Sequence, residues 1–282
     1  MTLQTDEERS VTAGDGVRLR ARIDPAFERS GHGTLLLINS LGCELTMWDP
    51  QVAPWRATHD VLRYDQRGHG RSDAPRGPYD LVRLGRDATA VLDAFGVDQA
   101  DVCGLSLGGL VAQQLCLDAP TRVRRVILAD TAARIGTRDG WLERAELVRA
   151  EGMAAVTEPV LGRFFSPTAL RDGGPAVASI RASLAGMDPD GYASSCAVLA
   201  AADLRGLLDG VPHAGLVIVG TADEATPPAD ARELADALPS ADYAELDGAG
   251  HLANLERPAA FADLVADFLA DSSSPVHAEP AR

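Results

Sequence analysis

The first feature of this sequence that could do chemistry is a serine flanked by small residues. Ser106 is the centre of Gly104-Leu-Ser-Leu-Gly108, which follows an apolar stretch and precedes a helical pattern. A turn this tight between a strand and a helix accepts only small residues at its outer positions, and it leaves the serine hydroxyl exposed on a strained backbone. The N-terminal amides of the following helix favour negative charge that develops there. We predict that Ser106 is a nucleophile; the alternative is a passive serine in a glycine-rich turn.

A serine hydroxyl needs a base, and histidine is the side chain best suited to that task near neutral pH. In folds built around this turn the acid and the histidine follow the serine along the chain, which leaves His213, His251 and His277. His277 lies in a polar tail, and His213 precedes a strand, at the far end of the sheet. His251, in Gly248-Ala-Gly-His251, follows the last strand, on the side where ligands collect in open α/β sheets. We therefore predict His251 as the base.

Two aspartates between the serine and the histidine could serve as the acid. Asp130 ends the apolar stretch 126–130, and Asp223 lies in Gly220-Thr-Ala-Asp-Glu-Ala-Thr-Pro227, the loop after a later strand. That loop can bend toward the next strand end and His251, so we predict Asp223. The alternative is Asp130, which otherwise closes the cleft or anchors the segment that follows it.

An acyl-transfer site also needs two backbone N–H groups aimed at the oxygen of the tetrahedral intermediate. The residue after the nucleophile, Leu107, supplies one of them. The second should come from the loop after the strand 34–39, where the sequence reads Asn39-Ser-Leu-Gly42. Small residues on both sides of Leu41 let the backbone approach closely, so we predict Leu41 and Leu107 as the oxyanion hole.

These residues must be positioned by a doubly wound, mostly parallel α/β sheet. Short apolar stretches bounded by turn residues predict buried strands, and stretches with apolar residues at helical spacing lie between them. Residues 17–23 alternate apolar and basic side chains, as in an edge strand with one wet face. The predicted strands are 34–39, 61–65, 100–105, 125–130, 216–220 and 243–247, and the predicted helices are 81–95, 107–118, 229–237 and 258–269.

The stretch 134–210 breaks this alternation, because it contains several helical patterns and no convincing strand. Each of its helices has one apolar face and needs the rest of the chain to cover it. We predict a helical cap at 134–210 inserted into a core formed by 1–133 and 211–270; the alternative is an independent second domain. Residues 271–282 are rich in serine, proline and charge without periodicity, so we expect a disordered tail.

Composition limits the possible partners. The chain has 282 residues, 46% of them hydrophobic, and a formal net charge of −15. Such acidity disfavours nucleic acid or an anionic membrane as partner. The four cysteines show no metal-binding spacing, the N-terminus has no apolar signal segment, and no apolar run is long enough to span a bilayer. We expect a cytoplasmic protein without a metal, and the oligomeric state stays open.

Longer motifs resemble a known family. Tyr64-Asp-Gln-Arg-Gly-His-Gly-Arg-Ser72, the turn around Ser106 and the Gly248–His251 segment resemble the α/β-hydrolase superfamily across nearly the whole chain. A narrower set resembles the 3-oxoadipate enol-lactonases. It comprises Asn39-Ser-Leu-Gly42, Met47-Trp-Asp-Pro50, Gly104-Leu-Ser-Leu-Gly-Gly109, Thr131-Ala-Ala-Arg-Ile-Gly-Thr137 and Gly220-Thr-Ala-Asp-Glu-Ala-Thr-Pro-Pro228.

The resemblance implies an α/β-hydrolase fold and cofactor-free opening of 3-oxoadipate enol-lactone to 3-oxoadipate, in the β-ketoadipate pathway of aromatic catabolism. That small-molecule substrate is an anion, so a local cation should offset the negative field of the protein. We expect Arg134, where the chain enters the cap, to bind its carboxylate, and Trp141 to line the pocket. The alternatives are a haloperoxidase-like perhydrolase or esterase, a carbon–carbon bond hydrolase, and a hydrolase-fold protein that binds ligands without catalysis.

Overall fold

A computed structural model describes residues 6–27 and 33–271 of the chain. Their centre is an eight-stranded sheet in the order β1-β2-β4-β3-β5-β6-β7-β8. The pairs β1–β2 and β2–β4 are antiparallel and the other five pairs are parallel. The strands are β1 (Glu7–Thr12), β2 (Arg18–Asp24), β3 (Gly33–Ile38), β4 (His59–Tyr64), β5 (Ala100–Leu105), β6 (Val123–Ala129), β7 (Ala214–Gly220) and β8 (Ala241–Leu246). The predicted fold class is confirmed.

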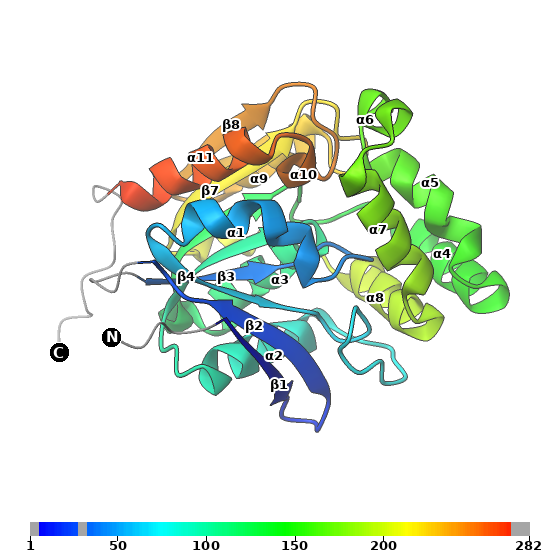
Figure 1. Ribbon diagram of the computed structural model, residues 1–282, viewed down its shortest axis with the longest axis horizontal. Coiled ribbons are helices and arrows are strands. Elements are labelled where there is room, and N and C mark those ends of the chain that lie inside the picture. The colour runs from blue at the N-terminus through cyan, green and yellow to red at the C-terminus, as the bar shows by residue number, and fades with distance from the viewer. Residues whose placement is uncertain (1–5, 28–32, 272–282) are drawn as a thin grey trace.

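Helices cover both faces of the sheet. On one face α1 packs against α11, and on the other α2 packs against α3, as Figure 1 shows. The strands β5 and β7 are buried along their whole length because they lie between these layers. The helices that flank the sheet are α1 (Asp49–Trp55), α2 (Leu81–Ala94), α3 (Leu107–Asp118), α9 (Pro228–Ala237), α10 (Ala253–Glu256) and α11 (Pro258–Ala270).

Between β6 and β7 the chain forms five helices that gather at one side of the molecule (Figure 1). They are α4 (Arg138–Glu151), α5 (Ala154–Phe164), α6 (Pro167–Asp172), α7 (Pro175–Gly186) and α8 (Pro189–Ala201). The fully described stretch 134–210, which we call the cap, contains no strand. Within it α4 packs along α8 and α5 packs against α7. Of the predicted tail 271–282, all but the first residue lie outside the described residues.

The strand β1 and the helices α1 and α10 of the core were not predicted from the sequence. The strand β1 forms the outer edge of the sheet beside β2, and only Val11 of its six residues is buried. An edge strand with one buried residue has no alternation of apolar and polar side chains by which to find it. The helix α1 contains Pro54 in its interior, which is a signal against a helix.

Candidate active site

Ser106 stands on the sharp turn between β5 and α3. Its backbone has φ 58° and ψ −116°, a strained conformation for a residue with a side chain. The glycines on either side permit the turn, because a Cβ atom at Gly104 would collide with the Gly108 carbonyl and one at Gly108 would collide with the Ile38 carbonyl. The sequence motif therefore folds into the strand–turn–helix geometry that it predicts.

Three side chains from separate loops meet at this turn. The Nε2 atom of His251 lies 2.9 Å from the Ser106 hydroxyl oxygen, and its Nδ1 atom lies 2.8 Å from a carboxylate oxygen of Asp223. Asp223 is oriented by the Thr226 hydroxyl, which donates to it at 2.7 Å, and by the N–H of Ala225 at 2.7 Å. Ser106, His251 and Asp223 are all buried. This geometry lets histidine accept the serine proton while the carboxylate stabilises the resulting cation.

Asp130, the alternative acid, makes different contacts. Its carboxyl accepts the N–H of Gly220 at 2.9 Å and the N–H of Ala253 at 3.2 Å, so it joins the end of β7 to the loop of the histidine. Its φ is 44°, which is a second strained backbone near the site. The structure thus brings Asp223, and not Asp130, to His251.

The pKa values of the two aspartates are shifted in opposite directions. Burial raises the pKa of Asp130 well above its ordinary value, and the charge of the nearby Asp223 raises it further. Burial also acts to raise the pKa of Asp223, but the charge and hydrogen bond of His251, with the bonds from Thr226, outweigh it and the pKa is lowered. The pKa values of the two carboxyl groups are therefore shifted in opposite directions, so Asp223 at the histidine is the stronger acid of the pair.

The predicted oxyanion amides flank the nucleophile. Leu107 is the first residue of α3, so its N–H has no partner within the helix. Leu41 lines the same pocket as Ser106, and its N–H makes no hydrogen bond to another described residue. The loop before it is fixed by Asn39, whose side chain accepts from the Trp48 indole at 2.9 Å and donates to the Tyr64 carbonyl at 2.8 Å.

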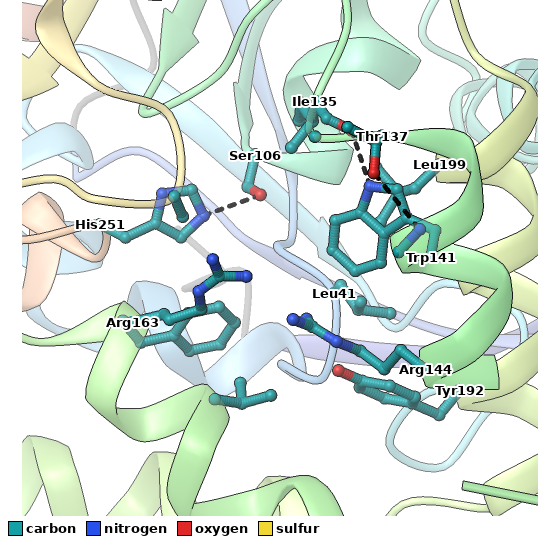
Figure 2. A pocket seen from close by; sticks show the side chains of 15 residues that line it. Leu41, Ser106, Ile135, Thr137, Trp141, Arg144, Arg163, Tyr192, Leu199 and His251 are labelled. Atoms are coloured by element: carbon teal, nitrogen blue, oxygen red, sulfur yellow. Dashed lines mark hydrogen bonds between the residues drawn. The ribbon is translucent and has the colours of Figure 1, made fainter. Parts of the chain in front are cut away.

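A pocket of about 300 Å³ opens over Ser106 and His251 and is roofed by the cap. Its far wall is formed by cap side chains, and Figure 2 shows the guanidinium groups of Arg144 and Arg163 pointing into it. The lining residues are Leu41, Ser106, Ile135, Gly136, Thr137, Gly140, Trp141, Arg144, Val160, Arg163, Phe164, Tyr192, Leu199, Ala225 and His251.

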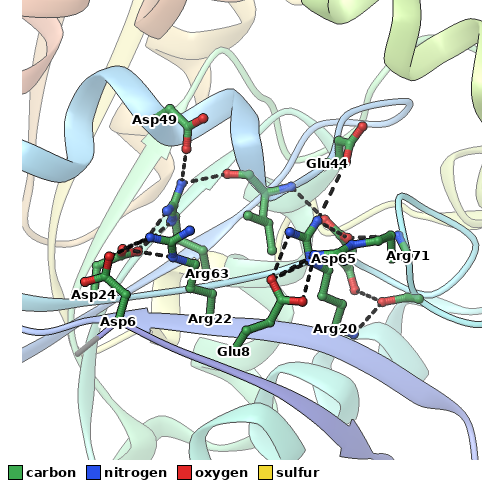
Figure 3. A network of polar contacts seen from close by, with 12 residues as sticks. Asp6, Glu8, Arg20, Arg22, Asp24, Glu44, Asp49, Arg63, Asp65 and Arg71 are labelled. Carbon is green, nitrogen blue, oxygen red and sulfur yellow. Dashed lines mark hydrogen bonds and ion pairs between the residues drawn. The ribbon is translucent and has the colours of Figure 1, made fainter. Parts of the chain in front are cut away.

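Neither pocket arginine has an acidic partner, in contrast to most arginines that the structure describes. Figure 3 shows one network in which buried Arg63 pairs with Asp24 at 2.8 Å and with Asp49 at 2.6 Å. Arg144 and Arg163 form no ion pair with any carboxylate in the described parts of the chain. In a chain with 41 acidic residues, two unpaired arginines in one pocket indicate a place for an anionic ligand.

The structure corrects the prediction for Arg134. This side chain does not line the pocket of Ser106; it faces a separate hollow and lies 3.6 Å from the carboxylate of Asp203. Its neighbour Ile135 takes the place on the pocket wall. Trp141 does line the pocket, where its indole N–H donates to the Ile135 carbonyl at 2.6 Å.

Comparison with known proteins agrees with this geometry. The model of the alpha/beta hydrolase family matches residues 35–264. The chain belongs to the alpha/beta hydrolase family. It is 39% identical to 3-oxoadipate enol-lactonase 2 of Acinetobacter baylyi over 235 residues, which are 83% of this chain and 88% of that one.

Two solved structures of hydrolases have a similar fold. The crystal structure of the enol-lactonase from Burkholderia xenovorans has a TM-score of 0.88 and 43% identity, over 94% of this chain and all of that chain. A thermophilic esterase from Thermogutta terrifontis, solved with malate bound, has a TM-score of 0.86 and 25% identity, over 94% of this chain and 98% of that chain.

In this α/β hydrolase the cap is joined directly to the loop that carries His251. The carboxylate of Glu256 accepts three hydrogen bonds: from the N–H of Gly250 at 3.0 Å, and from the N–H and hydroxyl of Ser166 at 2.8 and 2.6 Å. The ring of Phe164 lies 5.4 Å from the His251 ring, centroid to centroid. Glu256 therefore couples the position of the imidazole to that of the cap.

We expect Glu256→Ala to lower kcat about tenfold or more, because a small displacement of a reacting group has a large effect on rate. Glu256→Gln should retain most of the activity, since its amide oxygen can accept both N–H groups while its NH₂ donates to the Ser166 hydroxyl. Steady-state rates on one ester substrate, with Tm as the control for folding, test this. Equal losses in the two variants at unchanged Tm would mean that the charge matters, and not the positioning.

Two further properties of the described residues bear on the chemistry. His, Cys, Asp and Glu side chains there form no group of three or more able to bind a metal ion. No helix among them is long and apolar enough to cross a membrane.

Proposed function

We propose that this hydrolase opens 3-oxoadipate enol-lactone to 3-oxoadipate, as part of aromatic catabolism through the β-ketoadipate pathway. The observation that carries the proposal is the pair of unpaired arginines in the pocket of Ser106. This lactone carries one carboxylate remote from its reactive carbonyl, and a guanidinium group binds a carboxylate through parallel charge-assisted hydrogen bonds. The similarity to two proteins named as enol-lactonases supports the same substrate.

In the proposed mechanism Ser106 attacks the lactone carbonyl as its proton passes to the Nε2 atom of His251, 2.9 Å away. The N–H groups of Leu41 and Leu107 stabilise the tetrahedral oxyanion, and Asp223 stabilises the imidazolium. Collapse breaks the ring C–O bond and leaves an acyl group on Ser106. The leaving oxygen is an enol, more acidic than an alcohol, so it needs little help from the proton that His251 returns.

The second half of the reaction uses the same groups. The enol tautomerises to the ketone, and a water molecule gives its proton to His251 as it attacks the acyl carbonyl. The Ser106 oxygen then leaves and recovers a proton from His251, so serine and histidine end in their starting states. Every step is assigned to the side chains and amides of this chain, without a metal or organic cofactor.

A comparison of two lactones tests the proposal. The neutral α-angelica lactone has the same unsaturated ring with a methyl group in place of the carboxymethyl group. We expect kcat/KM to be at least about thirtyfold higher for the anionic enol-lactone, because a ligand that lacks one partner of a buried, hydrogen-bonded charge pair loses about 2–5 kcal/mol. Equal rates on the two lactones, or faster turnover of simple esters or of peroxide-dependent substrates, would favour the esterase or perhydrolase alternatives.

We expect Arg144→Ala to lower kcat/KM for the enol-lactone by roughly thirtyfold or more, because it removes a cation that faces the ligand. Arg144 is preorganised, since its guanidinium carbon lies 4.6 Å above the Trp141 ring. Arg134→Ala is the matched control: it removes the same charge from the separate hollow and should stay within about twofold of wild type. The assignment fails if Arg134→Ala is the more damaging of the two variants.

A further inference from the structure

One buried hydroxyl group in the pocket has no acceptor for its proton among the described residues. Tyr192, on α8, is fully buried and lines the pocket of Ser106. Its hydroxyl makes no hydrogen bond of normal geometry with any of the described residues. Burying a hydroxyl group without a partner is unfavourable, and most buried side-chain hydroxyls in proteins are hydrogen-bonded. An unsatisfied donor that faces a cavity therefore calls for a ligand atom that accepts.

The surroundings of this hydroxyl select the kind of acceptor. Figure 2 shows the hydroxyl of Tyr192 turned toward the guanidinium of Arg144, at the part of the pocket away from Ser106 and His251. Burial raises the pKa of Tyr192, and the charge and hydrogen bond of Arg144 lower it only in part, so the hydroxyl is a donor at neutral pH. A donor beside an unpaired cation fits an anion with two acceptor oxygens.

Both groups are held in place by packing. The Arg144 guanidinium stacks over Trp141, and α4 packs along α8, which carries Tyr192. The Tyr192 ring also lies against the loop 39–42 that carries Leu41, which we call the oxyanion loop. A Cβ atom built at Gly42 would be 3.7 Å from this ring. The distance between this ring and the oxyanion loop is therefore set by the fold. A carboxylate bound there would be at a fixed distance from the carbonyl that Ser106 attacks.

We propose that Tyr192 and Arg144 together form the seat for the substrate carboxylate, with the tyrosine hydroxyl donating to one oxygen and the guanidinium to the other. This rests on the proposed function and deepens it: the enzyme selects lactones or esters with a carboxylate remote from the reactive carbonyl. Arg163, on α5, is exposed and also lines the pocket, but it is not part of this seat.

The chain offers a matched control for the tyrosine. Tyr64, on β4, is also fully buried with a hydroxyl that lacks a partner among the described residues, but it does not line the pocket. Tyr64→Phe and Tyr192→Phe each remove one buried oxygen and nothing else. Tyr192→Phe should lower kcat/KM for the enol-lactone by about tenfold to a hundredfold, mainly through KM, whereas Tyr64→Phe should stay within about twofold. The loss on neutral α-angelica lactone should be several-fold smaller than on the enol-lactone.

Binding of adipate, an unreactive dicarboxylate of the same carbon count as 3-oxoadipate, gives a second measurement that needs no turnover. Adipate should raise the Tm of wild type and of Tyr64→Phe, and should raise that of Tyr192→Phe much less. Without adipate, Tyr192→Phe should be at least as stable as wild type, because it removes an unsatisfied hydroxyl.

The outcomes separate this seat from the proposed function. If wild type does not open the enol-lactone but adipate binding still depends on Tyr192 and Arg144, the function is wrong and the seat stands. If the lactone is opened and Tyr192→Phe behaves like Tyr64→Phe in both measurements, the seat is wrong. It is also wrong if Tyr192→Phe loses activity equally on both lactones, or if only Arg163→Ala abolishes the effect of adipate.

Discussion

Replacing Ser106 by alanine is expected to lower kcat for lactone hydrolysis by about 10⁴- to 10⁶-fold, with the fold intact. The Ser106 oxygen is the atom that forms the acyl bond in the proposed mechanism. It lies 2.9 Å from the Nε2 atom of His251, which takes its proton. Serine, histidine and acid act as a unit, so the loss of one removes most of what all three contribute. The measurement is the steady-state rate of the purified variant, at enzyme concentrations high enough to detect residual turnover.

Folding of the Ser106→Ala protein should be checked by its Tm, which we expect to be equal to or above that of wild type. The strained backbone at φ 58° persists in the variant, because Gly104 and Gly108 and the surrounding strands impose it. A folded Ser106→Ala protein with a tenth of the wild-type rate would exclude Ser106 as the nucleophile.

Asp223→Asn is expected to lower kcat by about 10⁴-fold, while Asp130→Asn should lose less than about tenfold. Asp223 accepts from the Nδ1 atom of His251 at 2.8 Å, so an amide there would favour the wrong imidazole tautomer and could not stabilise the cation. Asp130 makes no hydrogen bond with His251, and its carboxyl accepts the backbone N–H groups of Gly220 and Ala253, one of which the amide oxygen of asparagine can still accept. The reverse order of the two losses, in folded proteins, would assign the acid to Asp130.

The raised pKa of Asp130 also predicts that the free energy of unfolding depends on pH. The pKa of Asp130 is raised in the folded state, so its stabilising contribution is complete below its unfolded pKa of about 4 and is lost as pH rises toward the raised value. Asparagine does not titrate. The Tm of Asp130→Asn should therefore improve relative to wild type as pH rises above about 4, and a constant difference across pH 4 to 8 would contradict the raised pKa of Asp130.

Much of the core could be predicted because its signals are local. The strand β5 (Ala100–Leu105) and the helix α3 (Leu107–Asp118) have the predicted bounds, since a short apolar stretch, a glycine turn and a proline after the helix mark them. The order of serine, acid and histidine along the chain reduced six histidines to three, and the place of His251 after the last strand then selected it. The choice between Asp130 and Asp223 needed the structure, because it depends on which loop bends toward His251.

The pocket wall was harder to predict, since it depends on how cap helices rotate against the core. Arg134 was chosen for its place at the entrance of the cap, but Ile135 faces the pocket instead. A local signal for Arg144 did exist, because residues three apart on a helix share a face and Trp141 stands three residues before it. No sequence pattern marks Tyr192, whose significance comes from a hydroxyl left without a partner by packing.

The most direct test of the central claim is an ultraviolet assay of enol-lactone generated in place from muconolactone by its isomerase. On addition of the wild-type protein, the lactone should disappear far faster than by spontaneous hydrolysis, with 3-oxoadipate as the product, and addition of Ser106→Ala should leave the spontaneous rate unchanged. Decay at the spontaneous rate with wild-type protein that turns over simple esters, or equal acceleration by both proteins, would contradict the account.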